Sequence, residues 1–96
     1  MLENERRREH RILFDVDVYV YLNSGIAPGK SANISNSGMT VVLSIELNVG
    51  EQFRLEFQIG AVTILATATV KYRDLYRHGF QFSEPIELSR LLGERA

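Results

Sequence analysis

From Ile12 onward, apolar and polar side chains alternate along the chain with a period of two residues. This period places successive side chains on opposite faces of an extended strand, so it predicts half-buried β-strands. The alternation is clearest over residues 12–22, 39–44, 53–59 and 62–72. In the first of these stretches, one face carries Phe14, Val16, Val18, Val20 and Leu22. Most of the chain is therefore expected to form a sheet with one buried face.

Turn-forming residues separate these stretches. The turn signals lie at residues 23–25, 28–29, 48–50, 60–61 and 74–77. Pro28-Gly29 is expected to interrupt the β-structure with a turn, so that only a short, weak strand follows over residues 30–33. Gly60-Ala61 has the composition of a hairpin tip, and a last strand is expected over residues 79–82.

A short helix is predicted after the last strand. Ser83-Glu84-Pro85 combines a capping hydroxyl, an acidic residue near the positive end of the helix dipole and a proline in the first turn. The helical spacing of Ile86, Leu88, Leu91 and Leu92 predicts that this helix ends near Gly93.

Five or six short strands followed by one helix indicate an all-β fold, either a small antiparallel barrel or a sandwich. The stretch that starts at Val62 is long enough to bend around a corner and close a barrel, which has no free strand edge to protect. The helix would cover one open end. Ninety-six residues suit one domain. We place it at residues 12–96, after an arginine-rich arm of residues 1–11.

The composition of the chain limits the cellular compartment and the classes of partner that we expect. The chain has no cysteine, which excludes disulfides and thiolate metal sites and fits a reducing compartment. No apolar run approaches the ~20 residues of a membrane-spanning helix, and the basic start lacks the apolar stretch of a signal peptide. We expect a soluble cytoplasmic protein with no membrane insertion. The formal net charge of −1 gives no reason to expect DNA or RNA as a partner.

No set of residues resembles catalytic machinery. His10 and His78 are the only histidines, neither has a recognisable motif around it, and we expect both to be solvated. Asp15 and Asp17 share one face of the first strand, where a pair of carboxylates can hold a hard cation but more often simply faces water. A phosphate-binding GxxxxGK[ST] loop is absent. We therefore expect no enzyme activity, no metal and no cofactor.

An arginine cluster stands directly before the first strand. It contains Arg6, Arg7, Arg8 and Arg11, with no lysine. The planar guanidinium donates two parallel hydrogen bonds to a phosphate or to the O6/N7 edge of guanine, and its face stacks on aromatic rings. The alternative is a solvated basic tail balanced by neighbouring glutamates. The cluster therefore suits an anionic purine ligand without requiring one.

The second candidate is the polar segment Asn33-Ile34-Ser35-Asn36-Ser37-Gly38, which we expect to form a tight loop. Asn and Ser side chains bind their own backbone in many turns, and glycine often supplies a positive φ. A glycine also lets a ligand approach the backbone closely. Taken alone, the segment is compatible with plain turn chemistry.

Together, the two segments resemble the PilZ domain, a bacterial family of receptors for the second messenger cyclic di-GMP. The family pattern is RxxxR before the first barrel strand, often with a further arginine, followed by [D/N]xSxxG. Here these motifs are Arg7-Arg8-Glu9-His10-Arg11, preceded by Arg6, and Asn33-Ile34-Ser35-Asn36-Ser37-Gly38. Gly79-Phe80-Gln81-Phe82 is similar to the glycine-aromatic strand that ends the family's barrel. The resemblance implies a six-stranded antiparallel split β-barrel with a short C-terminal α-helix.

The resemblance also implies a ligand and a mode of action. Cyclic di-GMP would be bound on the outside of the barrel by Arg6, Arg7, Arg11, Asn33, Ser35 and Gly38, with Arg8 and Gly79 as further candidates. Arg6 suggests two stacked ligand molecules per chain. The arm has little to bury, so we expect it to be flexible alone and to fold over the nucleotide. The folded arm would change the surface of the protein, and this change would relay the signal to an unidentified effector protein that controls motility, pili or exopolysaccharide.

Two alternatives stay open. One is a degenerate PilZ-like module that binds proteins but no nucleotide. The other is a small oligonucleotide-binding barrel, because Tyr19 and Tyr21 lie on an outward strand face where bases can stack. Basic residues are sparse outside the arm, which disfavours the second alternative.

Overall fold

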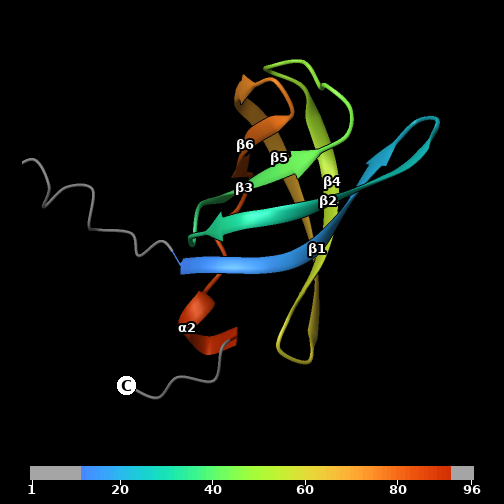
Figure 1. The fold of residues 1–96 in the computed structure, drawn as a ribbon. Coiled ribbons are helices and arrows are strands. Elements are labelled where there is room, and N and C mark those ends of the chain that lie inside the picture. Colours follow the sequence, from blue (N-terminus) through green and yellow to red (C-terminus); the bar gives the residue numbers. More distant parts are fainter. Residues whose placement is uncertain (1–11, 92–96) are drawn as a thin grey trace, which may run out of the picture.

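The computed structural model describes residues 12–91, which form six strands and one short helix. The elements are β1 (Ile12–Leu22), β2 (Gly25–Ile34), β3 (Gly38–Leu43), β4 (Gln52–Ile59), β5 (Val62–Asp74), β6 (Arg77–Phe82) and α2 (Leu88–Leu91). Every neighbouring pair of strands is antiparallel, and the order β1-β2-β3-β6-β5-β4 closes into a barrel (Figure 1). The predicted six-stranded antiparallel barrel is confirmed, and the sandwich is not formed.

Strand β5 turns the corner that closes the barrel. Its first part pairs with β4 from Val62 to Thr69, and its second part pairs with β6 from Ala68 to Asp74. The register shifts between Val70 and Tyr72, as expected where a strand bends sharply. The bend predicted for this long strand is confirmed, and it lets one strand serve two parts of the wall.

The alternation seen in the sequence separates the inside of the barrel from the outside. Each strand contributes its alternate apolar residues to one core, while the intervening positions face outward. The most fully buried of these side chains are Val18, Val20, Ile34, Val41, Leu55, Ile59, Ala68 and Val70. No cysteine or other cross-link is needed, because this core and the closed backbone ladder hold the fold.

Strand β2 is longer than predicted. Pro28-Gly29 does not break it, and the strand runs unbroken from Gly25 to Ile34. Pro28 pairs with Tyr19 of β1 at a position that precedes the first residue pair between β2 and β3, Gly29↔Leu43. The missing N–H of proline is therefore placed on an edge where no third strand needs it, the usual location of proline in a sheet.

The helix is shorter than predicted and begins later. It starts at Leu88 and not near Ser83, and the backbone N–H groups of Ser83 and Ile86 are bonded to other parts of the barrel. The Ser83 N–H donates to the Thr67 carbonyl at 2.8 Å, and the Ile86 N–H donates to the Asn36 carbonyl at 2.9 Å. These bonds hold residues 83–87 in a bent, non-helical path until α2 begins.

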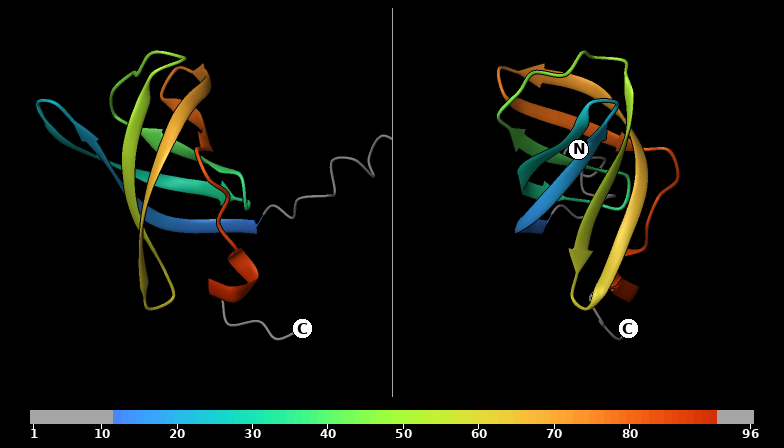
Figure 2. Two further views of the ribbon diagram at one scale, coloured as in Figure 1. Left: turned by 180° about the vertical axis from the view of Figure 1, so that it is seen from behind. Right: turned by 90° about the vertical axis from the view of Figure 1, so that its right-hand side faces the viewer.

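Helix α2 lies at one end of the barrel, as Figure 2 shows. Leu88 is buried in the core and Leu91 packs against it, which agrees with a helix that covers an open end. No helix within residues 12–91 is long and apolar enough to cross a bilayer.

The two aspartates on β1, Asp15 and Asp17, form ion pairs with a lysine of β2. Lys30 of β2 lies with its Nζ 3.1 Å from Asp17 and 3.6 Å from Asp15, and these side chains are largely exposed. The hydrogen bond to Asp17, followed by the attraction of both carboxylates, raises the pKa of Lys30. The two aspartates therefore belong to a solvent-exposed strand face. This is the interpretation that the sequence analysis preferred to a cation site.

The expectation that His78 is solvated is wrong. Its side chain is fully buried, and its Nε2 accepts a hydrogen bond of 2.9 Å from the Leu47 N–H. The proton therefore resides on Nδ1, which donates to the Tyr76 carbonyl at 2.9 Å. Both ring nitrogens are satisfied by backbone groups, so His78 ties the segment after β3 to the start of β6. His10 lies outside the described residues.

Stability is expected to depend on pH through His78. Burial lowers the pKa of this imidazole below its ordinary value of about 6.5. Below pH ~6.5 the unfolded chain therefore binds a proton that the folded chain resists, and the free energy of unfolding decreases as pH falls toward the lowered native pKa. Above pH ~6.5 both states are neutral and this contribution is fully retained.

Urea denaturation of the wild type and of His78→Gln at several pH values between ~7 and ~5 tests this dependence. The variant is less stable at pH 7, but its free energy of unfolding is expected to decrease less over this range. A His10→Gln variant measures the contribution of the other histidine. Equal pH slopes for the wild type and His78→Gln would contradict the assignment.

Candidate functional site

The polar segment singled out in the sequence is only partly a loop. Asn33 and Ile34 complete β2, Gly38 opens β3, and the connection itself is Ser35–Ser37. Asn33 pairs with Thr40 of β3, and its carbonyl accepts a hydrogen bond of 3.1 Å from the Ser31 hydroxyl. The motif therefore spans two strand ends and a three-residue turn, which gives its side chains fixed positions.

Ser35 organises this turn from inside. The residue is fully buried, and its N–H donates to the Gly38 carbonyl at 2.8 Å. Its hydroxyl accepts from the Ser37 N–H at 3.3 Å and donates weakly to the Gly38 carbonyl at 3.4 Å. In this structure the predicted ligand contact Ser35 is engaged with the backbone of its own turn. Its chemistry is thus the local side-chain–backbone bonding that serine favours in turns.

Asn36 links the turn to the C-terminal segment, a role that sequence analysis missed. Its side-chain Oδ1 accepts a hydrogen bond of 3.0 Å from the Leu88 N–H, and its carbonyl accepts from the Ile86 N–H at 2.9 Å. Leu88 is the first residue of α2, so Asn36 supplies from a distance the capping oxygen that helix starts require. The Ser37 carbonyl also accepts from the Phe82 N–H at 2.7 Å.

The two glycines among the candidates are required by close packing. A Cβ at Gly38 would lie 2.2 Å from the Phe80 carbonyl oxygen, so the approach of β3 to β6 excludes any side chain there. Gly38 is not among the glycines with positive φ, which in the described residues are Gly25, Gly50 and Gly60. A Cβ at Gly79 would lie 2.1 Å from the ring of Tyr72, its cross-strand neighbour.

A shallow depression of about 190 Å³ lies beside this turn, on the outer face of β3, β5 and β6. Hydroxyl and amide groups of Ser37, Thr40 and Gln81 line it, and its single charged residue is Lys71. Tyr72 also lines it, with the hydroxyl 3.3 Å from that of Thr40. The depression therefore offers one cation, several hydrogen-bonding groups and an aromatic ring, a combination suited to an anionic ligand that carries planar rings.

Sequence analysis did not identify Tyr72 as a site residue. The alternation along its strand shows which residues face outward, but it does not show which residues of the adjacent strand lie opposite them. Its ring covers the backbone at Gly79 and stays about half exposed, at 52%. A tyrosine opposite a glycine on a neighbouring strand is a recurrent sheet arrangement, but the register that makes them opposite follows from the bulge between Val70 and Tyr72.

The arginine cluster Arg6, Arg7, Arg8 and Arg11 lies outside the described residues. Its attachment point is described, because β1 starts at Ile12 and Ile12 pairs with Ile34, directly before Ser35. The chain therefore enters the barrel beside the polar turn. Ile12, the residue that follows the arginine motif in the sequence, and Ile34, within the polar motif, therefore pair at one end of the β1–β2 ladder.

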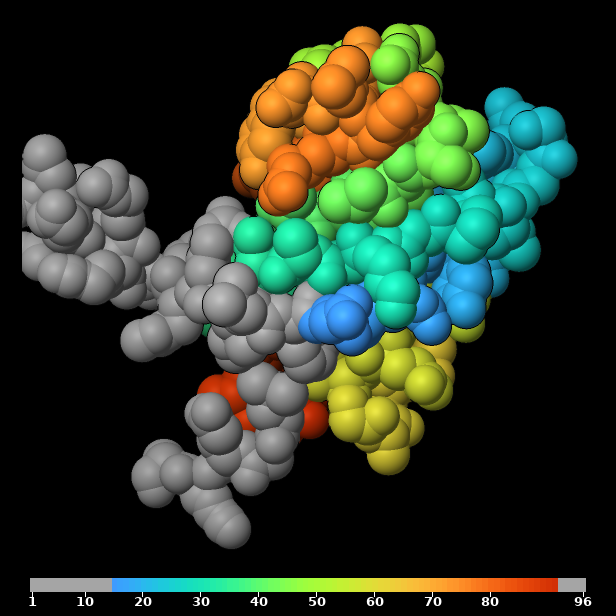
Figure 3. Space-filling view, viewed as in Figure 1, coloured from blue at the N-terminus to red at the C-terminus, as the bar shows by residue number. Residues whose placement is uncertain are grey.

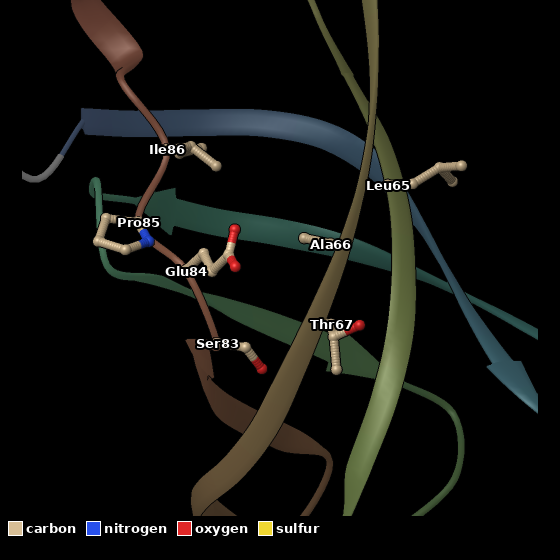
Figure 4. Close-up of a pocket in the computed structure, with 7 residues that line it drawn as sticks. All are labelled: Leu65, Ala66, Thr67, Ser83, Glu84, Pro85 and Ile86. Atoms are coloured by element: carbon tan, nitrogen blue, oxygen red, sulfur yellow. The ribbon is translucent and has the colours of Figure 1, made fainter.

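A larger depression of about 360 Å³ lies elsewhere, between β5 and the segment that follows β6 (Figure 4). Leu65, Ala66, Pro85 and Ile86 line it together with the hydroxyl groups of Thr67 and Ser83, and Glu84 is its only charged residue. A carboxylate repels an anionic ligand, so this depression is the poorer candidate for a nucleotide.

The outward tyrosines of β1 are confirmed as surface residues, with Tyr19 40% and Tyr21 38% exposed. The Tyr21 hydroxyl donates to Glu56 of β4, and this hydrogen bond raises the pKa of Tyr21. Their surroundings combine the carboxylates of Glu56 and Asp17 with the basic side chains of Arg54 and Lys30, so this mixed face is not the positive groove typical of single-strand binders. This face does not favour the oligonucleotide alternative.

Comparison with solved structures identifies the same barrel in three proteins. The PilZ domain of YcgR from Escherichia coli, solved with c-di-GMP, has a TM-score of 0.70 at 20% identity, covering 81% of this chain and 78% of that one. The Bacillus subtilis inhibitor of motility MotI/DgrA has a TM-score of 0.75 at 24% identity over 92% of this chain, which spans 48% of MotI. The PilZ domain of CeSA from a cellulose-synthesizing bacterium has a TM-score of 0.65 at 19% identity, covering 85% of this chain and 87% of that one.

No curated protein matches the sequence. The model of the PilZ domain, in contrast, matches residues 5–94, which include both polar motifs and all six strands of the barrel. A match of this extent agrees with the strand order and with the position of the polar turn, and the chain belongs to the PilZ domain family.

Proposed function

We propose that this protein is a cyclic di-GMP receptor that acts as an adaptor for another protein. The observation that carries the proposal is the pairing of Ile12 with Ile34, which attaches the arginine cluster beside the polar turn. Membership of the PilZ family supports it, as does the c-di-GMP in the structure of the YcgR domain. The presence of both motifs in intact form argues against a degenerate module.

The ligand suits the groups gathered there. Cyclic di-GMP carries two anionic phosphodiesters and two guanines. Arg7 and Arg11 would bind a phosphate and a guanine edge through paired N–H donors, and a guanidinium face is available for stacking. Arg8 is a further candidate for the same chemistry. These contacts would draw the arm onto the outer surface of the barrel.

The turn and the depression would form the opposite wall of the site. Asn33 would donate to and accept from the second guanine, and Gly38, which carries no side chain, would leave room for the ligand beside the turn. Gly79 lies under the Tyr72 ring, so the ligand would meet that ring and not the Gly79 backbone. The buried Ser35 hydroxyl would hold the turn in shape or exchange its internal bond for one to the ligand. Lys71 would supply a positive charge near a phosphodiester.

The output would pass to a partner protein. Ligand binding would stabilise one placement of the arm and so change the surface that the partner meets. The printed name of MotI, an inhibitor of motility, supports a role in motility control, and pilus or exopolysaccharide control are the other outputs that we consider. We propose a non-catalytic role in the cytoplasm, where the absence of cysteine is expected.

Isothermal titration of the purified chain with cyclic di-GMP tests the proposed function. GTP and the linear dinucleotide serve as controls, because they contain the same base and phosphate groups without the compact ring. Saturable binding of the cyclic dinucleotide alone is expected. Absence of binding, or equal binding of all three, would overturn the proposal.

Arg7→Ala and Arg11→Ala are each expected to weaken cyclic di-GMP binding at least about 10-fold, because a charge-assisted hydrogen bond contributes about 1.5–3 kcal/mol. The matched control is Arg90→Ala, which removes an exposed arginine of α2 that pairs only loosely with Glu87, at 3.8 Å. Calorimetry that gives the same affinity for all three variants would remove the arm from the site.

Tyr72 is expected to provide a stacking surface for a guanine. Tyr72→Ala should weaken binding about 10-fold, within the ~1–3 kcal/mol typical of base–aromatic stacking, whereas Tyr72→Phe should keep most of the affinity. Thermal denaturation of both variants shows whether the uncovered Gly79 also lowers stability. A folded Tyr72→Ala variant with wild-type affinity would place the ligand elsewhere.

We further expect two stacked cyclic di-GMP molecules per chain, with Arg6 contacting the second. Calorimetric titration of the wild type should then saturate at a molar ratio of two, and Arg6→Ala should lower it to one. Saturation of the wild type at one ligand per chain would refute the stacked pair while leaving the receptor function in place.

A further inference from the structure

One outer face of the barrel carries apolar side chains in two adjacent rows. The first row consists of cross-strand neighbours on β2, β1, β4 and β5, namely Ile26, Tyr21, Arg54 and Thr67. The second row lies two residues away on each strand and consists of Pro28, Tyr19, Glu56 and Leu65. We call these eight residues the β1–β4 face. It holds four of the ten exposed large apolar side chains in residues 15–91, and a continuous group of this kind indicates a binding surface.

The β1–β4 face is held in one conformation. Val20 and Leu55, which lie between the two rows, are fully buried in the core and anchor β1 and β4 from behind. The Tyr21 hydroxyl donates to Glu56 and so ties a side chain of one row to a side chain of the other. Figure 3 shows β1 in blue between β2 in teal and the β4–β5 hairpin in yellow. A pre-formed surface loses little conformational entropy when it binds, so this face suits docking.

Two opposite charges stand at the centre of the β1–β4 face. Arg54 and Glu56 are two residues apart on β4, so both side chains lie on the same side of the sheet. Arg54 forms no ion pair with any residue of the described part of the chain. Glu56 accepts a hydrogen bond from the neutral Tyr21 hydroxyl, which does not compensate its negative charge. Both charges are therefore available to a second surface.

We propose that the β1–β4 face binds the same face of a second copy of this chain. A two-fold axis that crosses the strands midway between the two rows turns each row onto the other row of the second copy. Arg54 then meets Glu56 of the second copy, and Tyr19 meets Tyr21 of the second copy. The remaining pairs formed by this rotation are Ile26 with Pro28 and Thr67 with Leu65. Because the contact is symmetric, each of these pairs forms twice.

The order of the charges on β4 favours a second copy over another occupant. An unrelated protein would have to present a carboxylate and a cation in the reverse order at the same spacing, whereas the rotated face does so by symmetry. Glu56 at the centre repels the phosphates of a nucleic acid. Edge-to-edge pairing of β2 is also disfavoured, because Pro28 lacks the N–H that a continuous ladder requires.

Sedimentation equilibrium of the ligand-free chain tests the proposal. A monomer–dimer equilibrium is expected for the wild type, and Tyr19→Ser should raise the dimer dissociation constant at least about 10-fold. The matched control is Tyr76→Ser, which removes a tyrosine of similar exposure, 48%, from the turn between β5 and β6. This variant should dimerise like the wild type. A wild-type chain that stays monomeric up to millimolar concentration would overturn the proposal.

Exchange of the two central charges tests the register of the contact. Arg54→Glu sets carboxylates against each other and Glu56→Arg sets guanidinium groups against each other, so each variant should dimerise at least about 10-fold more weakly. An equimolar mixture of the two variants should form a heterodimer, because both of its central contacts join opposite charges. Native mass spectrometry distinguishes this heterodimer by its mass. The double variant Arg54→Glu/Glu56→Arg should recover the homodimer.

The control for charge reversal is Arg90→Glu, at an exposed position of α2, which should dimerise like the wild type. Equal dimerisation of Arg54→Glu and Arg90→Glu, or a mixture that yields no heterodimer, would contradict the proposed contact. Cyclic di-GMP affinity of Arg54→Glu should equal that of the wild type, because β3 and β6, beside the depression at Tyr72, lie across the barrel from β1 and β4. Failure of the dimer and failure of the receptor function are thus separable.

Discussion

The close antiparallel pairing of β3 with β6 is the constraint on which the rest of this structure depends. It joins the two halves of the sheet into a closed barrel, and it runs from Gly38↔Gln81 to Val42↔Arg77. At the Gly38↔Gln81 end of this ladder only a glycine fits at position 38, because the Phe80 carbonyl lies where a Cβ would be. The polar turn begins at this end, and the shallow depression bordered by Tyr72 lies along the ladder. The turn and the depression are therefore positioned by the same pair of strands.

The turn between β2 and β3 serves both the fold and the site. The buried Ser35 bonds to the backbone of the turn itself. The two oxygens of Asn36 accept hydrogen bonds from the N–H groups of Ile86 and Leu88. A ligand that bound to this turn would be connected through two hydrogen bonds to the start of α2, at the open end of the barrel. The motif therefore couples a surface loop to the C-terminal segment through hydrogen bonds.

Much of the fold follows from the sequence because it depends on local periodicity. The two-residue alternation sets which side of each strand is buried, and a strand as long as β5 has to bend when a small sheet closes. What the sequence did not provide depends on contacts between distant segments. Pro28 is tolerated because β3 starts pairing only one residue later, and α2 starts at Leu88 because Asn36 caps it from 52 residues away. His78 was expected in water because its partners, two backbone groups, leave no trace in the sequence.

For the site, the sequence motifs indicated Asn33, Ser35 and Gly38, and the structure places these residues around one turn. Tyr72 could not be found in the same way, since its position opposite Gly79 arises from a bulge. The central claim, that a cyclic dinucleotide lies on the outer face of the barrel between this turn and the arm, is tested most directly by a crystal structure of the chain grown with cyclic di-GMP. The account predicts ligand density over the depression bordered by Ser37 and Tyr72, in contact with guanidinium groups of the arm. Density inside the barrel, on the β1–β4 face or in the depression bordered by Glu84 would contradict it.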